Sequence, residues 1–214
     1  MEKICCIVSI KSEKDTQRIG LSDGSLFSYR NCYLPHDMPE NLLNSDTAKD
    51  SEISAYEEAA LRHASACLRT EKAALRLITR AEQCSGGLAR KLEKRGHDSS
   101  CVKAVIDRLL LLRLINDNRF AQLWLESRLR LARSPRCILI SLCSKGIDRD
   151  DADAALKAVL DDDTEYAVLL RFVKKRAKKI KSGGGDVKRS LKHMLKNEGF
   201  SYAAIQRFLD EDQT

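Results

Sequence analysis

A threefold pattern of apolar residues and glycines runs through the last two thirds of the chain. Each copy has two apolar residues four positions apart, a glycine four positions further on, and an Asp or Ser two positions after the glycine. The three copies are Leu88, Leu92, Gly96 and Asp98; Ile138, Leu142, Gly146 and Asp148; and Leu191, Leu195, Gly199 and Ser201. Successive glycines are 50 and 53 residues apart. A repeat of this length that is built on helical spacing predicts a tandem array of helical units.

Each copy predicts two helices that are joined by a sharp turn. Apolar residues four apart share one face of a helix, and a glycine after the last turn can adopt the left-handed conformation that ends it. The Asp or Ser that follows can accept hydrogen bonds from the free amides of the next helix. Ser85 and Asp186 are candidate N-caps for the first helix of a pair. Ser134 is a third, because Pro135 after it suits the first helical position.

A longer helix upstream of each pair is expected to cover its apolar stripe. The apolar positions of these three segments are Ala74, Leu75, Ile78 and Ala81; Phe120, Leu123, Trp124 and Leu131; and Tyr166, Leu170, Val173, Ala177 and Ile180. We expect Trp124 to be substantially buried at the junction of units. The predicted fold is mainly α, a tandem array of three three-helix repeats. Repeat 1 occupies residues 54–112 with a leading helix that starts near Ser54, repeat 2 occupies 113–160, and repeat 3 occupies 161–214.

The N-terminal region has the short, β-prone apolar run of a strand at residues 4–10. Asp23 and Gly24 suit a hairpin turn. We expect a small β-hairpin or three-stranded ribbon over residues 1–33, and a linker over residues 34–53, which are rich in Pro, Asn, Ser and acids. The triplet at residues 183–185 is Gly-Gly-Gly without a following Gly-Lys-Ser/Thr, so we interpret it as an interhelical loop and not as a phosphate-binding loop.

Composition agrees with a helical protein. The chain is 43% hydrophobic but only 5% aromatic, which favours helices over β-sandwiches. No apolar run approaches the roughly 18 residues that span a bilayer, and the first residues lack the pattern of a signal peptide. The eight cysteines include no Cys-x-x-Cys pair, which favours free thiols in a reducing compartment. We therefore expect a cytoplasmic protein.

The polar residues show no familiar catalytic or metal-binding motif. The four histidines have no Cys or carboxylate at a spacing typical of a zinc site, and no nucleophile motif is present. His97 stands where the other copies have Ile147 and Phe200. We therefore expect His97 to be partly buried in the place of an apolar residue. We expect a protein that is not an enzyme and that has no cofactor or metal.

Positive charge is concentrated in the helical array. Residues 1–55 hold six Lys or Arg against nine Asp or Glu, whereas residues 56–214 hold 32 against 22. Within the array, the acidic stretch 148–165 is followed by the basic stretch 171–192. Such patterning can attract DNA or an acidic protein groove, or it can simply solvate long polar helices.

Three short motifs in order resemble the bacterial RecX family of RecA regulators. They are the segment 114–121 (Leu-Ile-Asn-Asp-Asn-Arg-Phe-Ala), Lys145-Gly146-Ile147, and residues 199–201 (Gly-Phe-Ser). Family members typically have Leu-x-Asp-Asp-x-Arg-Phe-Ala, an Arg-rich helix and a Lys-Gly-Ile turn. Asn116 replaces the first Asp, and residues 134–136 (Ser-Pro-Arg) stand where the family usually has Gly-Pro. The resemblance covers about residues 56–210, and the N-terminal ribbon is similar to the extension of some longer members.

The resemblance implies a noncatalytic modulator that binds the RecA filament on single-stranded DNA and restrains recombination and coprotease activity in DNA repair and the SOS response. The resemblance leaves two modes of binding open: the protein can cap the ends of the filament, or it can bind along the filament groove. We expect a monomer that touches single-stranded DNA weakly or indirectly. Candidate partner-binding cations are Arg90, Lys91, Lys94, Arg95, Arg128, Arg130, Arg133, Arg136 and Lys145. Asp117 is expected to cap the helix that carries Phe120, and Arg119 to pair with a neighbouring carboxylate.

Two other functions fit the same residues. Two helices joined by a glycine turn also describe a helix-turn-helix DNA-binding protein, and a helical array can be a scaffold without nucleic acid. Three tandem copies weigh against a sequence-specific DNA-binding protein, because such proteins usually present one recognition helix per subunit. DNA binding that survives excess random competitor would favour the helix-turn-helix reading, whereas weak, salt-sensitive binding fits a filament regulator.

Overall fold

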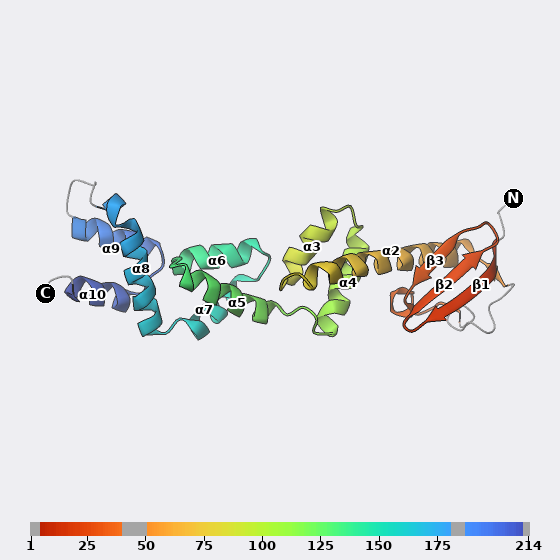
Figure 1. Cartoon of the computed structure of the whole chain (residues 1–214), viewed down its shortest axis with the longest axis horizontal. Coiled ribbons are helices and arrows are strands. Elements are labelled where there is room, and N and C mark those ends of the chain that lie inside the picture. Colours follow the sequence, from red (N-terminus) through yellow and green to blue (C-terminus); the bar gives the residue numbers. More distant parts are fainter. Residues whose placement is uncertain (1–4, 40–50, 181–186, 212–214) are drawn as a thin grey trace. The chain divides into compact units, whose positions relative to one another are not determined.

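The computed structural model describes residues 5–39, 51–180 and 187–211, with the backbone alone at 177–180 and 187 (Figure 1). The loop at residues 183–185, the candidate cap Asp186 and the side chains of Ala177 and Ile180 therefore lie outside the described part. The chain divides into two compact units, Met1–Ile115 and Asn116–Thr214. None of the described helices is long and apolar enough to cross a membrane.

The first unit begins with a four-stranded antiparallel sheet. Its strands are β1 (Cys5–Glu13), β2 (Thr16–Leu21), β3 (Leu26–Tyr29) and β4 (Glu52–Ile53), in the order β3-β2-β1-β4. The predicted hairpin turn is present: Gly24 has a φ of 87°, and the Asp23 carboxylate accepts from the Ser25 amide. β4 lies in the stretch that we predicted as a linker, where Ile53 pairs with Cys5. Leu34 and Met38 are also buried in the core, so part of that stretch belongs to the fold.

Three helices follow the sheet in the first unit. They are α2 (Ala55–Ile78), α3 (Ser85–Glu93) and α4 (Ser99–Leu111). Ser54 and Glu57 form a capping box at the start of α2, which fixes where the leading helix begins. One continuous core joins the sheet to these helices, and its fully buried members include Ile7, Ile19, Tyr29, Leu61, Leu88, Leu92 and Leu109.

A buried carboxylate fastens the sheet to the helices of the first unit. Glu71 on α2 is 3% exposed. One carboxylate oxygen lies 3.0 Å from Nε of Arg30, which follows β3 in the sequence. The other oxygen lies 3.5 Å from Nε of Arg108 on α4. The same carboxylate and the burial of the Tyr33 ring raise the pKa of the Tyr33 phenol, burial being the larger cause. Glu71 therefore connects three segments that are far apart in the sequence.

The second unit consists of two more helical repeats. Their helices are α5 (Asp117–Arg130), α6 (Pro135–Ser144), α7 (Arg149–Val159), α8 (Asp162–Ile180), α9 (Val187–Asn197) and α10 (Tyr202–Glu211). The core contains residues from all six helices and from the turns between them, including Leu125, Leu129, Ile138, Leu142, Leu156, Leu169, Phe172, Leu195, Phe200 and Ile205. The predicted mainly α fold with an N-terminal ribbon is confirmed (Figure 1).

The glycines of the threefold pattern end helices as predicted. Gly96, Gly146 and Gly199 follow α3, α6 and α9 with φ angles of 83°, 91° and 85°. Asp98, Asp148 and Ser201 then accept hydrogen bonds from the first amides of α4, α7 and α10. At Gly199 a β-carbon would also lie 3.2 Å from the backbone nitrogen of Arg136, so both conformation and space require glycine there.

Two predicted caps are wrong by one position. Asn116, and not Asp117, caps α5 by accepting from the Arg119 amide, and Asp117 is the first helical residue. Cys84 precedes α3 without a side-chain cap, and Ser85 is already helical. The predicted cap Ser134 is confirmed, with Pro135 as the first residue of α6.

The apolar stripes of the leading helices are partly wrong. Phe120 and Tyr166 are buried as predicted, and Ala74 is fully buried. Ala81, Leu123, Leu131 and Leu170 are exposed, and Trp124 is only half-buried. The reason lies in the helix period: the buried stripe of α5 follows Ala121, Leu125 and Leu129, each four positions apart. This rotation places Trp124 at the edge of the core.

Candidate partner-binding surface

An aromatic pair on α5 carries two of the predicted cations. The rings of Phe120 and Trp124 are stacked, with centroids 5.8 Å apart and planes 17° apart. The guanidinium carbon of Arg128 lies 3.9 Å from the Trp124 centroid, and Lys145 Nζ lies 4.2 Å from it. The Trp124 indole N–H donates to Ser141 Oγ at 3.0 Å, which fixes the ring against α6. We call Phe120, Trp124, Arg128 and Lys145 the cation–aromatic cluster.

Helical spacing and a turn together produce this cluster. Phe120, Trp124 and Arg128 are four positions apart on α5, so their side chains share one face. Lys145 comes from the turn before Gly146, at the end of α6. Both cations are half-buried and lie over aromatic faces, where the ring quadrupole attracts positive charge. The sequence placed the aromatics in the core and the cations on the surface, and the structure brings them together.

The other predicted cations of the second unit have different surroundings. Arg130 is exposed and pairs with Glu126 on its own helix at 3.4 Å. Arg133 is exposed and lines a groove of about 290 Å³ with Phe172, Lys175 and Arg176. Arg133 therefore lies beside two cations of the basic stretch 171–192 of repeat 3.

Arg136 is tied to another helix. Its backbone amide donates to Glu198 O and its Nη1 donates to Asn197 O, both at 3.0 Å. These carbonyls close the C-terminal end of α9, so Arg136 joins repeat 2 to repeat 3 within the second unit. A structural role at this junction accounts for Arg136 better than a role as a free partner-binding cation.

The first unit holds the remaining predicted cations on α3 and the turn after it. Arg90, Lys91, Lys94 and Arg95 are all exposed. Lys91 Nζ donates to Gln83 Oε1 at 2.6 Å, and Arg90 Nε donates to Gly86 O within its own helix. Lys94 and Arg95 lie where α3 ends, and positive side chains are favourable at that end of a helix.

Two histidines have neighbours that the sequence analysis did not foresee. His97 is half-buried, as predicted, and its Nδ1 lies 2.9 Å from Thr70 Oγ1. His63 and Cys67 are four positions apart on α2, and the structure adds Cys101 from α4 to this pair. The His63–Cys67 spacing was a sequence signal that we overlooked, whereas the approach of Cys101 depends on tertiary packing.

Comparisons with known proteins identify the helical repeats. Residues 72–109 match the family model described as the first three-helix domain of RecX, and residues 116–156 match that of its second three-helix domain. A regulatory protein RecX from Mycobacterium sp. (strain KMS) is 37% identical over 133 residues, which make up 59% of this chain and 72% of the relative. One from Treponema pallidum (strain Nichols) is 29% identical over 144 residues, 67% of this chain and 85% of the relative.

Two solved structures share the fold. A crystal structure of a regulatory protein RecX has a TM-score of 0.72 at 19% identity, covering 97% of this chain and 98% of that one. RecX from Lactobacillus salivarius has a TM-score of 0.58 at 22% identity, covering 68% of this chain and 96% of the other. The first of these two similarities covers the sheet-containing unit as well as the helical repeats.

Proposed function

The chain belongs to the RecX family of regulatory proteins, and on that premise we propose that it regulates RecA. In this proposal the protein binds the RecA filament on single-stranded DNA and restrains recombination and coprotease activity during DNA repair and the SOS response. It acts in the cytoplasm as a monomer and without catalysis. The observation that carries the proposal is the pair of matches to RecX three-helix domains, of which the second contains the cation–aromatic cluster.

The geometry of the cation–aromatic cluster suits a partner that carries carboxylates or phosphates. A guanidinium that stacks by its face keeps its N–H groups in the plane free for bidentate hydrogen bonds. The ring also holds the Arg128 side chain in place, which lowers the entropy lost when a partner binds. We propose Arg128, Arg133 and Lys145 as the main contacts in the second unit, and Lys94, Arg95, Arg90 and Lys91 as contacts in the first.

A double charge reversal tests this assignment. We expect Arg128→Glu with Arg133→Glu to raise the concentration needed for half-inhibition of RecA strand exchange at least about tenfold, equivalent to about 1.4 kcal/mol. RecA's DNA-dependent ATPase, measured with substoichiometric amounts of the protein, should show the same loss. Arg136 stays unchanged in this variant because its guanidinium supports the α6–α9 junction.

A matched control has the same change in net charge on another helix of the second unit. Arg149→Glu with Lys157→Glu reverses two exposed cations on α7. This control should inhibit RecA as the wild type does. Equal loss in both variants would mean that net charge, and not the cluster, governs binding. A wild-type protein without effect on RecA's ATPase or strand exchange would refute the proposed function and favour a scaffold.

The helix-turn-helix alternative receives less support from the second unit. In that reading the helix after each glycine turn would enter the DNA groove. In repeat 2 this helix is α7, whose first turn holds Asp150 and Asp151 and whose second holds Asp153. Carboxylates at that end repel phosphates, so α7 is poorly suited to bind DNA. Sequence-specific DNA binding that survives excess random competitor would restore the alternative.

A further inference from the structure

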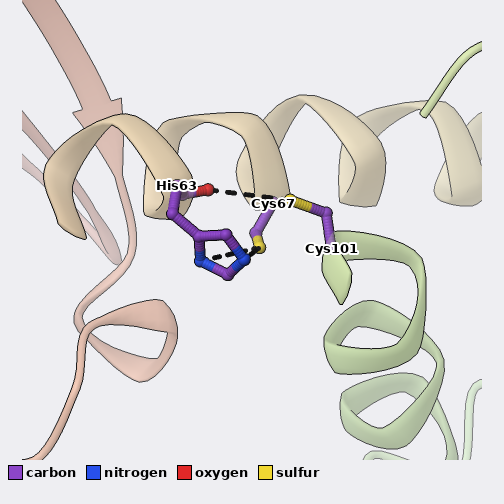
Figure 2. Close-up of side chains that lie close together, drawn as sticks. All are labelled: His63, Cys67 and Cys101. Carbon is purple, nitrogen blue, oxygen red and sulfur yellow. Dashed lines mark hydrogen bonds between the residues drawn. The ribbon is translucent and has the colours of Figure 1, made fainter. Parts of the chain in front are cut away.

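Three potential metal ligands meet between α2 and α4 in the first unit. His63 and Cys67 share one face of α2, and Cys101 approaches from the first turn of α4 (Figure 2). One ligand atom from each residue lies within 4.8 Å of the others. The two cysteines are fully buried, whereas His63 is exposed. The cluster is therefore built into the core but reachable from solvent.

The distance between Cys67 and His63 approaches that of two ligands in a tetrahedral metal site. Bond lengths to zinc of about 2.3 Å for sulfur and 2.0–2.1 Å for nitrogen place such ligands about 3.6–3.8 Å apart. Cys67 Sγ lies 3.8 Å from His63 Nδ1 and 3.9 Å from Nε2. Either ring nitrogen therefore lies close enough to Cys67 Sγ for both atoms to bind one ion.

A hydrogen-bonded chain selects the nitrogen that would bind. Ser100 Oγ donates its proton to the Asp98 carboxylate. The Ser100 oxygen can then only accept from His63 Nε2, which lies 2.9 Å away, so Nε2 carries the ring proton. The Ser100 and Cys101 amides also donate to the Asp98 carboxylate, which holds it beside the Ser100 hydroxyl. Nδ1 then keeps its lone pair for an ion, and it lies 3.8 Å from Cys67 Sγ.

Such an outer partner is what metal-binding histidines usually have. Their second ring nitrogen donates to a carboxylate, a carbonyl or another oxygen, which fixes the tautomer and orients the ring. Here the outer partner of His63 is the Ser100 hydroxyl, which is itself hydrogen-bonded to the Asp98 carboxylate. Thiolate and imidazole ligands together suit zinc, whereas magnesium and calcium prefer oxygen ligands.

We propose that His63, Cys67 and Cys101 form a site for a thiophilic transition metal ion, with zinc as the natural occupant. The three side chains supply three of the four tetrahedral positions, and solvent supplies the fourth through the exposed His63 side. The ion displaces the protons of the two thiols on binding. It joins α2 to α4 directly and stabilises the first unit.

Cobalt(II) titration of the reduced, full-length protein tests the site, because thiolate-bound cobalt gives a charge-transfer absorption in the near ultraviolet. We expect this band to saturate at one equivalent of cobalt and to disappear when zinc is added. Cys67→Ala and Cys101→Ala should each weaken the band, and His63→Ala should raise the dissociation constant at least about tenfold. His63 is exposed, so its variant keeps the fold even where a core cysteine variant does not.

The matched control removes two exposed cysteines from the second unit. Cys137→Ala with Cys143→Ala should leave the band and the dissociation constant unchanged. Zinc should also raise the melting temperature of the wild type and of this control, and at the same zinc concentration it should raise that of His63→Ala by less. No thiolate band at stoichiometric cobalt would overturn the proposal. A band that survives Cys67→Ala and Cys101→Ala but is lost in the control would overturn it as well.

Discussion

At the residue scale, Trp124 combines packing with a charged surface. Its indole N–H is bound to Ser141, Phe120 stacks on it, and Arg128 and Lys145 approach its ring. The ring is half-buried, so small solutes can reach it. Because two cations flank it, the local potential is positive and should attract anions.

Fluorescence quenching can measure this potential, because Trp124 is the one tryptophan in the chain. We expect iodide to quench its emission more strongly than caesium does, after correction for free tryptophan amide. The reason is that the flanking cations attract the anion and repel the caesium ion. Arg128→Glu should reduce or reverse this preference. Equal quenching by both ions in the wild type would contradict the observed arrangement of the cluster.

At the scale of elements, the junction of α6 with α9 connects repeats 2 and 3. The start of α6 meets the end of α9, where Arg136 binds two carbonyls. The Glu198 carboxylate accepts from the Ser134 hydroxyl and pairs with Arg176 at 2.8 Å. The positive end of one helix dipole thus lies beside the negative end of another, which is favourable.

Removal of the Glu198 carboxylate should weaken this junction. We expect Glu198→Ala to lower the free energy of unfolding of the second unit by about 1–3 kcal/mol, because the buried Ser134 hydroxyl loses its acceptor. Urea unfolding followed by Trp124 fluorescence measures the change. Arg176→Ala should cost less, about 1 kcal/mol, since it breaks a partly exposed ion pair and the contact of the guanidinium with the Phe172 ring. Both variants lose the ion pair, so the reverse order would show that the contact of Arg176 with Phe172 contributes more than the hydrogen bond of the Ser134 hydroxyl.

The fold follows from the sequence where local rules decide it. The glycines at helix ends and the caps at Ser134, Asp98 and Asp148 depend on residues a few positions away. The buried face of α5 does not follow from local rules, because this segment has two apolar stripes. One contains Leu125 and Leu129, and the other contains Leu123 and Leu131. Packing against the neighbouring helices chooses between two such stripes, and the sequence of one helix cannot reveal that choice.

The candidate sites depend still more on tertiary contacts. As a charged residue, Arg136 is expected at the surface and available to a partner. Its role is set instead by the carbonyls of Asn197 and Glu198, about sixty positions later in the sequence. Cys101 meets His63 and Cys67 only because α4 packs on α2. The list of exposed cations was predictable from composition and helix period, whereas the aromatic rings beneath Arg128 and Lys145 were not.

At the scale of the whole molecule, charge is unequal between the two units. The first unit holds 18 Lys or Arg against 16 Asp or Glu, and the second holds 20 against 15. The second unit thus carries most of the net charge of +7. Charge of this sign steers a protein toward a polyanionic filament mainly by raising the association rate.

The kinetics of filament binding should therefore depend on salt. Between about 50 and 200 mM salt, we expect the association rate with RecA on single-stranded DNA to fall several-fold, with a smaller change in the dissociation rate. The Arg128→Glu, Arg133→Glu variant should show a weaker dependence. Surface-based binding kinetics can measure both rates. An association rate that is independent of salt would exclude electrostatic steering.

The contact of Glu71 with Arg30 and Arg108 also limits which substitutions the protein can accept during evolution. Loss of either arginine leaves the carboxylate underpaired, and loss of Glu71 leaves the guanidinium of Arg108 without this counterion and that of Arg30 with Asp15 alone. A single substitution at any of the three positions is therefore costly, and a viable lineage must alter them in concert. Relatives that lack the N-terminal sheet also lack the strand that brings Arg30, so in them the arginine of α4 should be the remaining partner of this carboxylate.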